Sequence, residues 1–236
     1  MQGQVFFLFF LLASATAQAA VQFDGTRVIY PAAKREVTLA LTNNASGPRL
    51  LQAWMDDGNP DLRPETGKVP FIVTPPVFRL NAEKGQSLRI RFTGGKVPQD
   101  RESVWWLNVL EVQPKTERGA KNPNLVHFPV RTRLKVFYRP AGLPGTPGGA
   151  VNTLRWRLSR EAGAMKIICE NPSAFNVSLA RISLYATDRP NEEVKGMCPA
   201  KGSAAFTLEG TETGKVYFTT ISDYGGFARH SAVYTG

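Results

Sequence analysis

The chain has 236 residues, of which 42% are hydrophobic and 20% are charged, a composition that fits one or two globular domains and excludes a disordered chain. Its formal net charge is +10 at pH 7. Because the positive residues are scattered and no RNA-recognition or zinc-finger motif accompanies them, no nucleic-acid partner is expected.

The N-terminus predicts export. Its first 20 residues carry no charge and contain an apolar block from Val5 to Leu12, followed by the small residues of ASATAQAA. The block is too short to span a bilayer, and Ala17-Gln18-Ala19 fits the small-residue pattern of a cleavage site. Residues 1–19 are therefore predicted to be a signal peptide, although the usual basic segment before the block is missing. No later segment is apolar enough to cross a membrane, so no membrane span is expected.

Short runs rich in β-branched and aromatic residues, bounded by Gly, Pro, Asn or Asp, follow along the chain. This pattern predicts strands of β-sandwiches, and no segment shows sustained helical periodicity. The first set comprises residues 27–31, 36–43, 50–57, 70–76, 87–93 and 103–112. The second set comprises residues 153–160, 164–172, 176–186, 204–210 and 215–226. The fold class is predicted to be all-β.

Between the two sets the sequence reads AGLPGTPGG, from Ala141 to Gly149. Such a turn-rich composition is typical of a domain boundary. We therefore predict two domains, over residues 20–140 and 141–236.

The run from Asn124 to Pro140, NLVHFPVRTRLKVFYRP, carries bulky residues at two-residue spacing. Side chains alternate along a strand, so Val126, Phe128 and Val130 are expected to share a face. Pro129 cannot donate a ladder hydrogen bond, which favours an edge strand over a central one. The three hydrophobic residues belong either to the core of their own domain or to a strand that is offered to a partner.

The chain contains two cysteines, Cys169 and Cys198. In an exported protein such a pair tends to form a disulfide, and a bridge within the C-terminal domain is predicted. The two histidines, His127 and His230, are isolated in the sequence. No metal site is therefore expected.

Six short motifs, taken in order with the signal peptide and the two β-domains, resemble the PapD-like family of periplasmic pilus chaperones. The motifs are GTRVIYP from Gly25, TPPVFRL from Thr74, VPQDRES from Val97, KVFYRP from Lys135, ENPS from Glu170 and SDYGG from Ser222. The resemblance covers essentially the whole mature chain. It implies two immunoglobulin-like sandwiches set like a boomerang, with a cleft between them.

The resemblance also implies a site that binds pilus subunits. Arg27 and Lys135 match two basic residues that hold the C-terminal carboxylate of a subunit in the cleft, a task that suits an Arg fork and a Lys point charge. Val126, Phe128 and Val130 would fill the groove of the subunit while the strand pairs with its edge, as in donor-strand complementation. Without the motifs, the two charges would be read as a solvated basic face.

One feature of the run conflicts with this reading. Lys135 lies an odd number of residues from Val126, Phe128 and Val130. Regular alternation therefore places Lys135 on the opposite face, unless a twist or a bulge intervenes.

Three further charges match residues that join the two domains in this family: Glu102, Arg139 and Asp223. Such a salt-bridge network would fix the angle between the domains, because buried ion pairs give specificity more than stability. The alternative is three unrelated surface charges of little energetic weight.

The sequence thus predicts a periplasmic chaperone that binds pilus subunits and delivers them to an outer-membrane usher. No G-x-S-x-G, H-E-x-x-H or P-loop motif occurs, so no enzymatic activity and no cofactor are expected. The alternative is a structural pilus subunit, which is usually a single incomplete domain. Whether the free protein self-associates through its exposed strand is left open.

Overall fold

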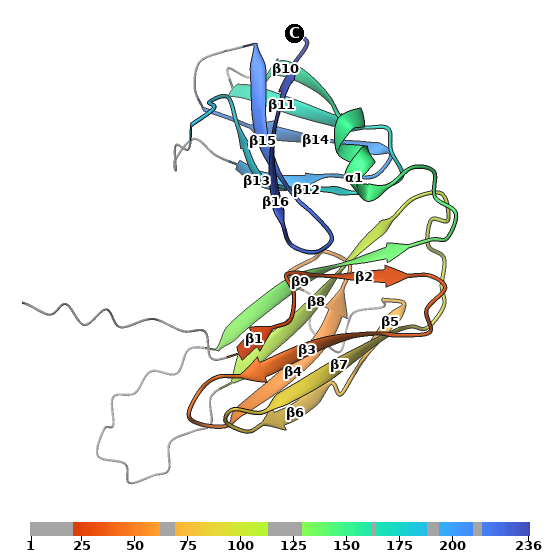
Figure 1. Cartoon of the computed structure of the whole chain (residues 1–236), viewed down its shortest axis with the longest axis vertical. Coiled ribbons are helices and arrows are strands. Elements are labelled where there is room, and N and C mark those ends of the chain that lie inside the picture. The colour runs from red at the N-terminus through yellow and green to blue at the C-terminus, as the bar shows by residue number, and fades with distance from the viewer. Residues whose placement is uncertain (1–20, 62–68, 113–128, 162–163, 188–193, 210–213) are drawn as a thin grey trace, which may run out of the picture.

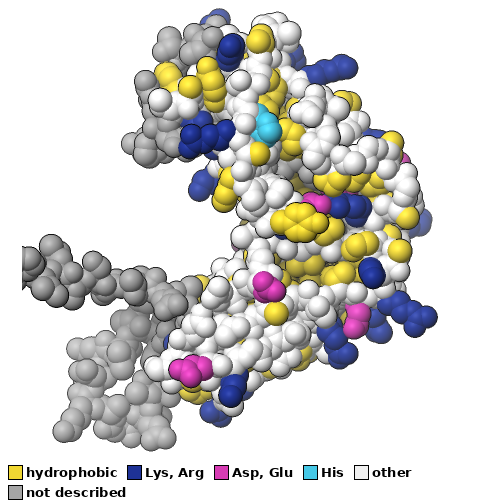
Figure 2. Space-filling view, in the orientation of Figure 1, with side chains coloured by type: hydrophobic (Ala, Val, Ile, Leu, Met, Phe, Trp, Pro, Cys, Tyr) yellow, Lys and Arg dark blue, Asp and Glu magenta, His cyan; other side chains and the backbone are white. Residues whose placement is uncertain are grey.

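The structure, a computed structural model, describes residues 21–61, 69–112, 129–161, 164–187, 194–209 and 214–236. Figure 1 shows two β-sandwich domains set at an angle, and Figure 2 shows the molecule hollowed between them. The predicted all-β, boomerang-like fold is confirmed. The predicted signal peptide and two residues of the proposed subunit-binding strand, Val126 and Phe128, lie outside the described residues.

The N-terminal domain packs two sheets face to face. One has the strand order β1 (Val21–Phe23), β3 (Val37–Asn43), β7 (Gly85–Phe92) and β5 (Phe71–Thr74). The other has the order β2 (Arg27–Pro31), β9 (Val130–Arg139), β8 (Ser103–Val112), β4 (Arg49–Asp56) and β6 (Val77–Leu80). Alternate residues of the strands build one core, in which Leu51, Leu107 and Val136 are fully buried, as expected for a sandwich.

The strands of the C-terminal domain follow a short helical segment, α1 (Pro147–Ala150) and η1 (Val151–Thr153). One of its sheets has the order β10 (Arg155–Glu161), β11 (Ala164–Asn171) and β14 (Gly202–Thr207). The other has the order β13 (Val194–Cys198), β12 (Val177–Ser183), β15 (Lys215–Ile221) and β16 (Phe227–Val233). A second, separate hydrophobic core lies between these two sheets.

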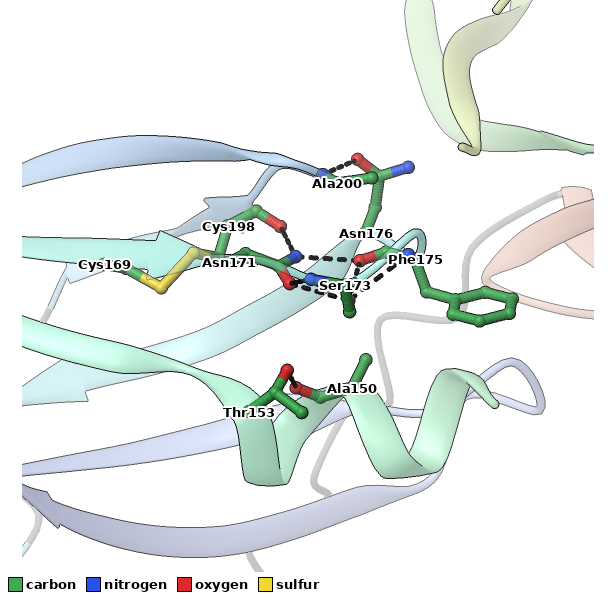
Figure 3. The surroundings of a disulfide bond; sticks show 9 residues. All are labelled: Ala150, Thr153, Cys169, Asn171, Ser173, Phe175, Asn176, Cys198 and Ala200. Carbon is green, nitrogen blue, oxygen red and sulfur yellow. Dashed lines mark hydrogen bonds between the residues drawn. A yellow bond between two sulfur atoms is a disulfide. The ribbon is translucent and has the colours of Figure 1, made fainter. Parts of the chain in front are cut away.

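Cys169 and Cys198 form a disulfide that links β11 to β13, and thus one sheet to the other. Both cysteines are fully buried. Beside the bridge, the Asn171 amide donates to the carbonyls of Phe175 at 2.8 Å and Cys198 at 3.2 Å (Figure 3). The predicted disulfide is confirmed, and Asn171 orders the loop that leads towards the other domain.

The sequence pattern did not predict four of the strands that the structure shows: β1, β6, β13 and β16. Strand β13 reads VKGMC, and its Gly196 lowers the strand propensity of this short segment. The glycine is required by packing, because a Cβ at this position would lie 2.3 Å from the ring of Phe206. Strand β16 reads FARHSAV and is mostly exposed, so it lacks a continuous apolar pattern.

One predicted strand was too long. Residues 215–226 were expected to form a single strand, but β15 ends at Ile221. The following SDYGG segment is a turn, in which the Ser222 amide donates to the Gly226 carbonyl at 2.8 Å. Gly225 has φ 82°, a conformation that a residue with a side chain rarely adopts. In Figure 1 this β15–β16 loop reaches towards β2 and β9.

Candidate functional site

Arg27 and Lys135 lie side by side. Strands β2 and β9 run parallel, and their register pairs Arg27 with Lys135. Along β9, Leu134, Val136 and Tyr138 point into the N-terminal core. Lys135 therefore points to the opposite face of the sheet, here named the outer face, and Arg27 shares that face because paired residues lie on the same side.

Arg27 reaches the C-terminal domain. Its Nη1 donates to the carbonyl of Ile221 at the end of β15, at 3.2 Å. Its Nε is buried with no hydrogen-bond partner among the described residues. Burial lowers the pKa of Arg27, and the charge of Asp223 acts in the opposite direction. Of the five N–H donors of the guanidinium, the described residues accept only from Nη1, so donors on the terminal nitrogens are left for an anion.

Lys135 lies in a positively charged setting. Burial lowers its pKa, and so does the neighbouring charge of Arg27. No carboxylate of the described residues forms an ion pair with it. Its Nζ lies 5.6 Å from the centroid of the Trp106 ring, which attracts a cation. A bound anion would relieve the repulsion between the two cations.

A cavity of about 590 Å³ connects this position to the C-terminal domain. Lys135 lines it from β9, and the other lining residues that the structure describes come from the C-terminal domain: Leu179, Ala180, Lys195, Gly196, Ile221 and Phe227. The cavity thus combines positive charge with apolar walls.

Arg139 joins carboxylates of both domains. Its Nε donates to Glu102 at 2.5 Å, and its Nη1 and Nη2 donate to Asp223 at 2.9 and 3.1 Å. Glu102 is 5% exposed and also accepts the backbone N–H of Asn176 at 2.9 Å. Burial alone would lower the pKa of Arg139, but the hydrogen bonds and charges of Asp223 and Glu102 raise it. The structure thus brings the three charges of the predicted network together at the domain junction.

The sequence did not predict two further contacts at this junction. Lys201 Nζ forms an ion pair with Asp100 at 2.9 Å across the domains. The guanidinium of Arg139 lies 5.5 Å from the centroid of the Phe175 ring, which points away from the disulfide in Figure 3. No motif marks Lys201 or Phe175, because their partners are distant in the sequence and only the folded chain brings them near.

The outer face of the N-terminal domain carries a second feature that the sequence did not reveal. The guanidinium of Arg133 lies 4.6 Å from the centroid of Trp106, the ring that Lys135 also approaches. Arg133 Nη2 donates to the fully buried carboxylate of Asp56 at 2.8 and 2.9 Å. The ring of Trp106 is therefore approached by the cations of both Arg133 and Lys135. The alternation of basic residues along β9 was visible, but their aromatic partner on β8 was not.

The first half of β9 has an open edge. Residues 130–134 pair with β8 on one side, and β2 begins to pair on the other side only at Lys135. Among the described residues, no strand pairs with the free edge of this half. Val130 at its start is 54% exposed. Exposed edges of this kind are templates for strand addition.

The sequence matches two family descriptions that together span most of the chain. Residues 20–144 match the PapD N-terminal domain of pili and flagellar-assembly chaperones, and residues 149–232 match the C-terminal domain of the pili assembly chaperone PapD. The chain belongs to the PapD-like family of pilus assembly chaperones. This family is a non-enzymatic class, and the alternative of a structural pilus subunit is not favoured.

Known relatives of this chain are also pilus or fimbrial chaperones. The chain is 42% identical over 219 residues to the LpfB chaperone protein of Salmonella typhimurium, and the match covers 91% of this chain and 89% of the relative. The crystal structure of the Pseudomonas aeruginosa CupB2 chaperone is 35% identical, with a TM-score of 0.72, covering 91% and 100% of the two chains. The Salmonella enterica SafB chaperone, solved in complex with the SafA pilin, matches at 29% identity and a TM-score of 0.76, covering 93% and 98%.

Two further observations concern the described part of the chaperone. It contains no group of three or more His, Cys, Asp or Glu residues that could hold a metal ion. None of its helices is long and apolar enough to cross a membrane.

Proposed function

We propose that this chaperone binds exported pilus subunits in the periplasm and anchors the C-terminal carboxylate of each subunit at Arg27 and Lys135. It caps the subunit by strand pairing and passes it to an outer-membrane usher, without a cofactor or enzymatic activity. In this proposal, residues 1–19 are removed on export, and residues 20–140 and 141–236 form the two domains. The register pairing of Arg27 with Lys135 beside the cavity between the domains carries the proposal.

The proposed carboxylate anchor is supported by the few hydrogen-bond and ion-pair partners that Arg27 and Lys135 have among the described residues. Arg27 donates to the described residues only through Nη1, and Lys135 has three donors and no ion pair among the described residues. Two adjacent cations that are partly removed from water repel each other, and an anion between them turns repulsion into charge-assisted hydrogen bonds. A free peptide C-terminus supplies such an anion.

Strand pairing is supported by the open edge of β9 and by its regular alternation. The even-numbered residues Leu134, Val136 and Tyr138 fill the core of the chaperone's own domain. Val126, Phe128 and Val130 have the same parity, so a regular strand would continue this apolar face beyond the sandwich. Beyond the sandwich, these side chains would enter the groove of a subunit instead of the domain's own core. Lys135 would bind the same subunit from the outer face. The opposite parity of Lys135 is thus compatible with one shared partner.

The partner class is supported by the SafB chaperone, whose structure contains a bound pilin. Delivery to an usher and location in the periplasm rest on the family and on the predicted signal peptide. The basic side chains of the site suit a carboxylate, and no step of this proposal requires ATP.

The test is subunit capture by variants of the two anchors. The chaperone is co-expressed with fimbrial subunit genes of the same organism, and bound subunit is measured by pull-down. Arg27→Ala and Lys135→Ala are each expected to abolish capture and to leave the chaperone folded, whereas Lys84→Ala, at an exposed lysine outside the cavity, is expected to retain it. If either anchor variant still protects subunits from degradation, the carboxylate anchor is wrong.

A further inference from the structure

The cavity between the domains contains a second lysine, contributed by the C-terminal domain. Lys195 on β13 lines it together with Lys135. Lys195 is exposed and forms no ion pair with any described residue. None of the described residues that line the cavity is acidic. Both walls of the cavity therefore present a positive charge that the described residues do not neutralise there.

A β-bulge in β12 lies opposite Lys195. In the pairing of β12 with β13, Leu179 faces Gly196 and Ile182 faces Val194. Two residues of β12 therefore lie opposite the single residue Lys195. Bulges of this kind locally increase the twist and redirect side chains, and they are frequent beside functional sites.

Packing behind the strand fixes this geometry. Gly196 follows Lys195 directly, and the Phe206 ring occupies the space that a side chain at position 196 would need. Strand β13 therefore cannot shift by one residue without a clash between Phe206 and the side chain that would replace Gly196. Lys195 is consequently held at the cavity by its own domain, independently of any partner.

The other walls of the cavity indicate which kind of ligand it suits. Leu179, Ile221 and the 72% exposed Phe227 supply apolar surface next to the cations. Burial and, to a smaller degree, the charge of Arg27 lower the pKa of Lys135, and an anion beside the two cations would offset their repulsion. A polypeptide C-terminus with an apolar last side chain satisfies both kinds of surface.

We propose that Lys195 is a third cation of the carboxylate site, so that the bound C-terminus of a subunit is held from both domains at once. Arg27 and Lys135 bind the carboxylate from the N-terminal domain, Lys195 attracts it from the C-terminal domain, and the last side chain packs against Phe227. This inference rests on the carboxylate anchor proposed above. It adds a residue that no family motif of this sequence contains.

The test uses two probes, acetyl-Ala-Ala-Ala-Leu with a free carboxylate and the same peptide as its C-terminal amide. Both are titrated into the ¹⁵N-labelled chaperone, and their affinities are measured from amide chemical shifts. The wild type is expected to prefer the free acid. Lys195→Gln is expected to weaken acid binding about two- to fivefold, the range of a partly exposed charge pair, and to leave amide binding unchanged. Lys195→Arg should retain the preference, and Lys84→Gln is the matched surface control.

Two outcomes overturn the inference and are distinguishable. If Lys195→Gln keeps the full preference for the acid while Arg27→Ala and Lys135→Ala lose it, the anchor holds and Lys195 is not part of it. If the wild type shows no preference for the acid, the anchor and the role of Lys195 fail together. A loss equally large for acid and amide would assign Lys195 to peptide packing and would also contradict the proposal.

Discussion

At the scale of single residues, Lys135, the proposed anchor, is expected to destabilise the fold of the free chaperone. The folded-state pKa of Lys135 lies below 10.5, the value of an unperturbed lysine, because of burial and the charge of Arg27. The native state therefore binds fewer protons than the unfolded state between these two pKa values, and stability rises with pH there. Below the folded-state pKa, the penalty for the charged lysine is fully present.

This reasoning predicts the effect of Lys135→Met. The variant removes the partly buried charge but retains an apolar side chain beside Trp106, so the free energy of unfolding of the free chaperone is expected to rise at pH 7. The difference from the wild type should shrink towards pH 10.5. Urea denaturation at several pH values measures both effects. A variant less stable than the wild type at pH 7 would show that the charge is stabilised by groups other than those described.

At the scale of elements, the disulfide is expected to stabilise the C-terminal domain alone. It joins β11 to β13 across a sequence separation of 29 residues. A loop of this length predicts a contribution of about 3–4 kcal/mol. Cys169→Ala combined with Cys198→Ala should lower the stability of the C-terminal domain by this amount in urea denaturation. The signal of Trp106 in the N-terminal domain serves as the internal reference and should keep its midpoint if the domains unfold separately.

The open edge of β9 yields a second prediction at this scale. Val130 is 54% exposed in the free chaperone, so Val130→Asp should change the free energy of unfolding by less than about 0.5 kcal/mol. Subunit capture should fall at least about tenfold, because the groove would have to bury an unpaired charge. Val233→Asp, at a 70% exposed position of β16, is the matched control. Equal capture by both variants would argue against strand pairing at this edge.

At the scale of the whole molecule, the network around Arg139 is expected to set the angle between the domains. Glu102→Ala removes a carboxylate that is 5% exposed and leaves the Asn176 N–H and one side of Arg139 without a partner. Loss of one member of a buried pair destabilises by about 3–5 kcal/mol, here concentrated at the junction. Residual dipolar couplings should therefore report a broader range of domain orientations.

A control for this prediction lies at the same junction. Lys201→Gln removes the ion pair with Asp100, whose side chains are 37% and 57% exposed. Exposed pairs contribute at most about 1 kcal/mol, so the domain orientation should remain that of the wild type. If Glu102→Ala also leaves the couplings unchanged, the angle is fixed by other contacts, such as the bond from Arg27 to Ile221.

The sequence by itself determined the class of the fold and most of its strands, because alternating apolar residues and turn-forming residues are local signals. It also indicated the disulfide, since two cysteines in a chain that is predicted to be exported tend to pair. It could not show β13 or β16, whose strand character comes from pairing with neighbours rather than from their own composition.

Only the tertiary structure decided how distant residues meet. Parallel pairing of β2 with β9 brings Arg27 beside Lys135, and Trp106 reaches both Arg133 and Lys135 through the register of β8. The bulge opposite Lys195 and the packing of Phe206 on Gly196 likewise have no local signature. The physical reason is that register, bulges and domain contacts are set by long-range packing, whereas strand patterns arise from the period of the chain itself.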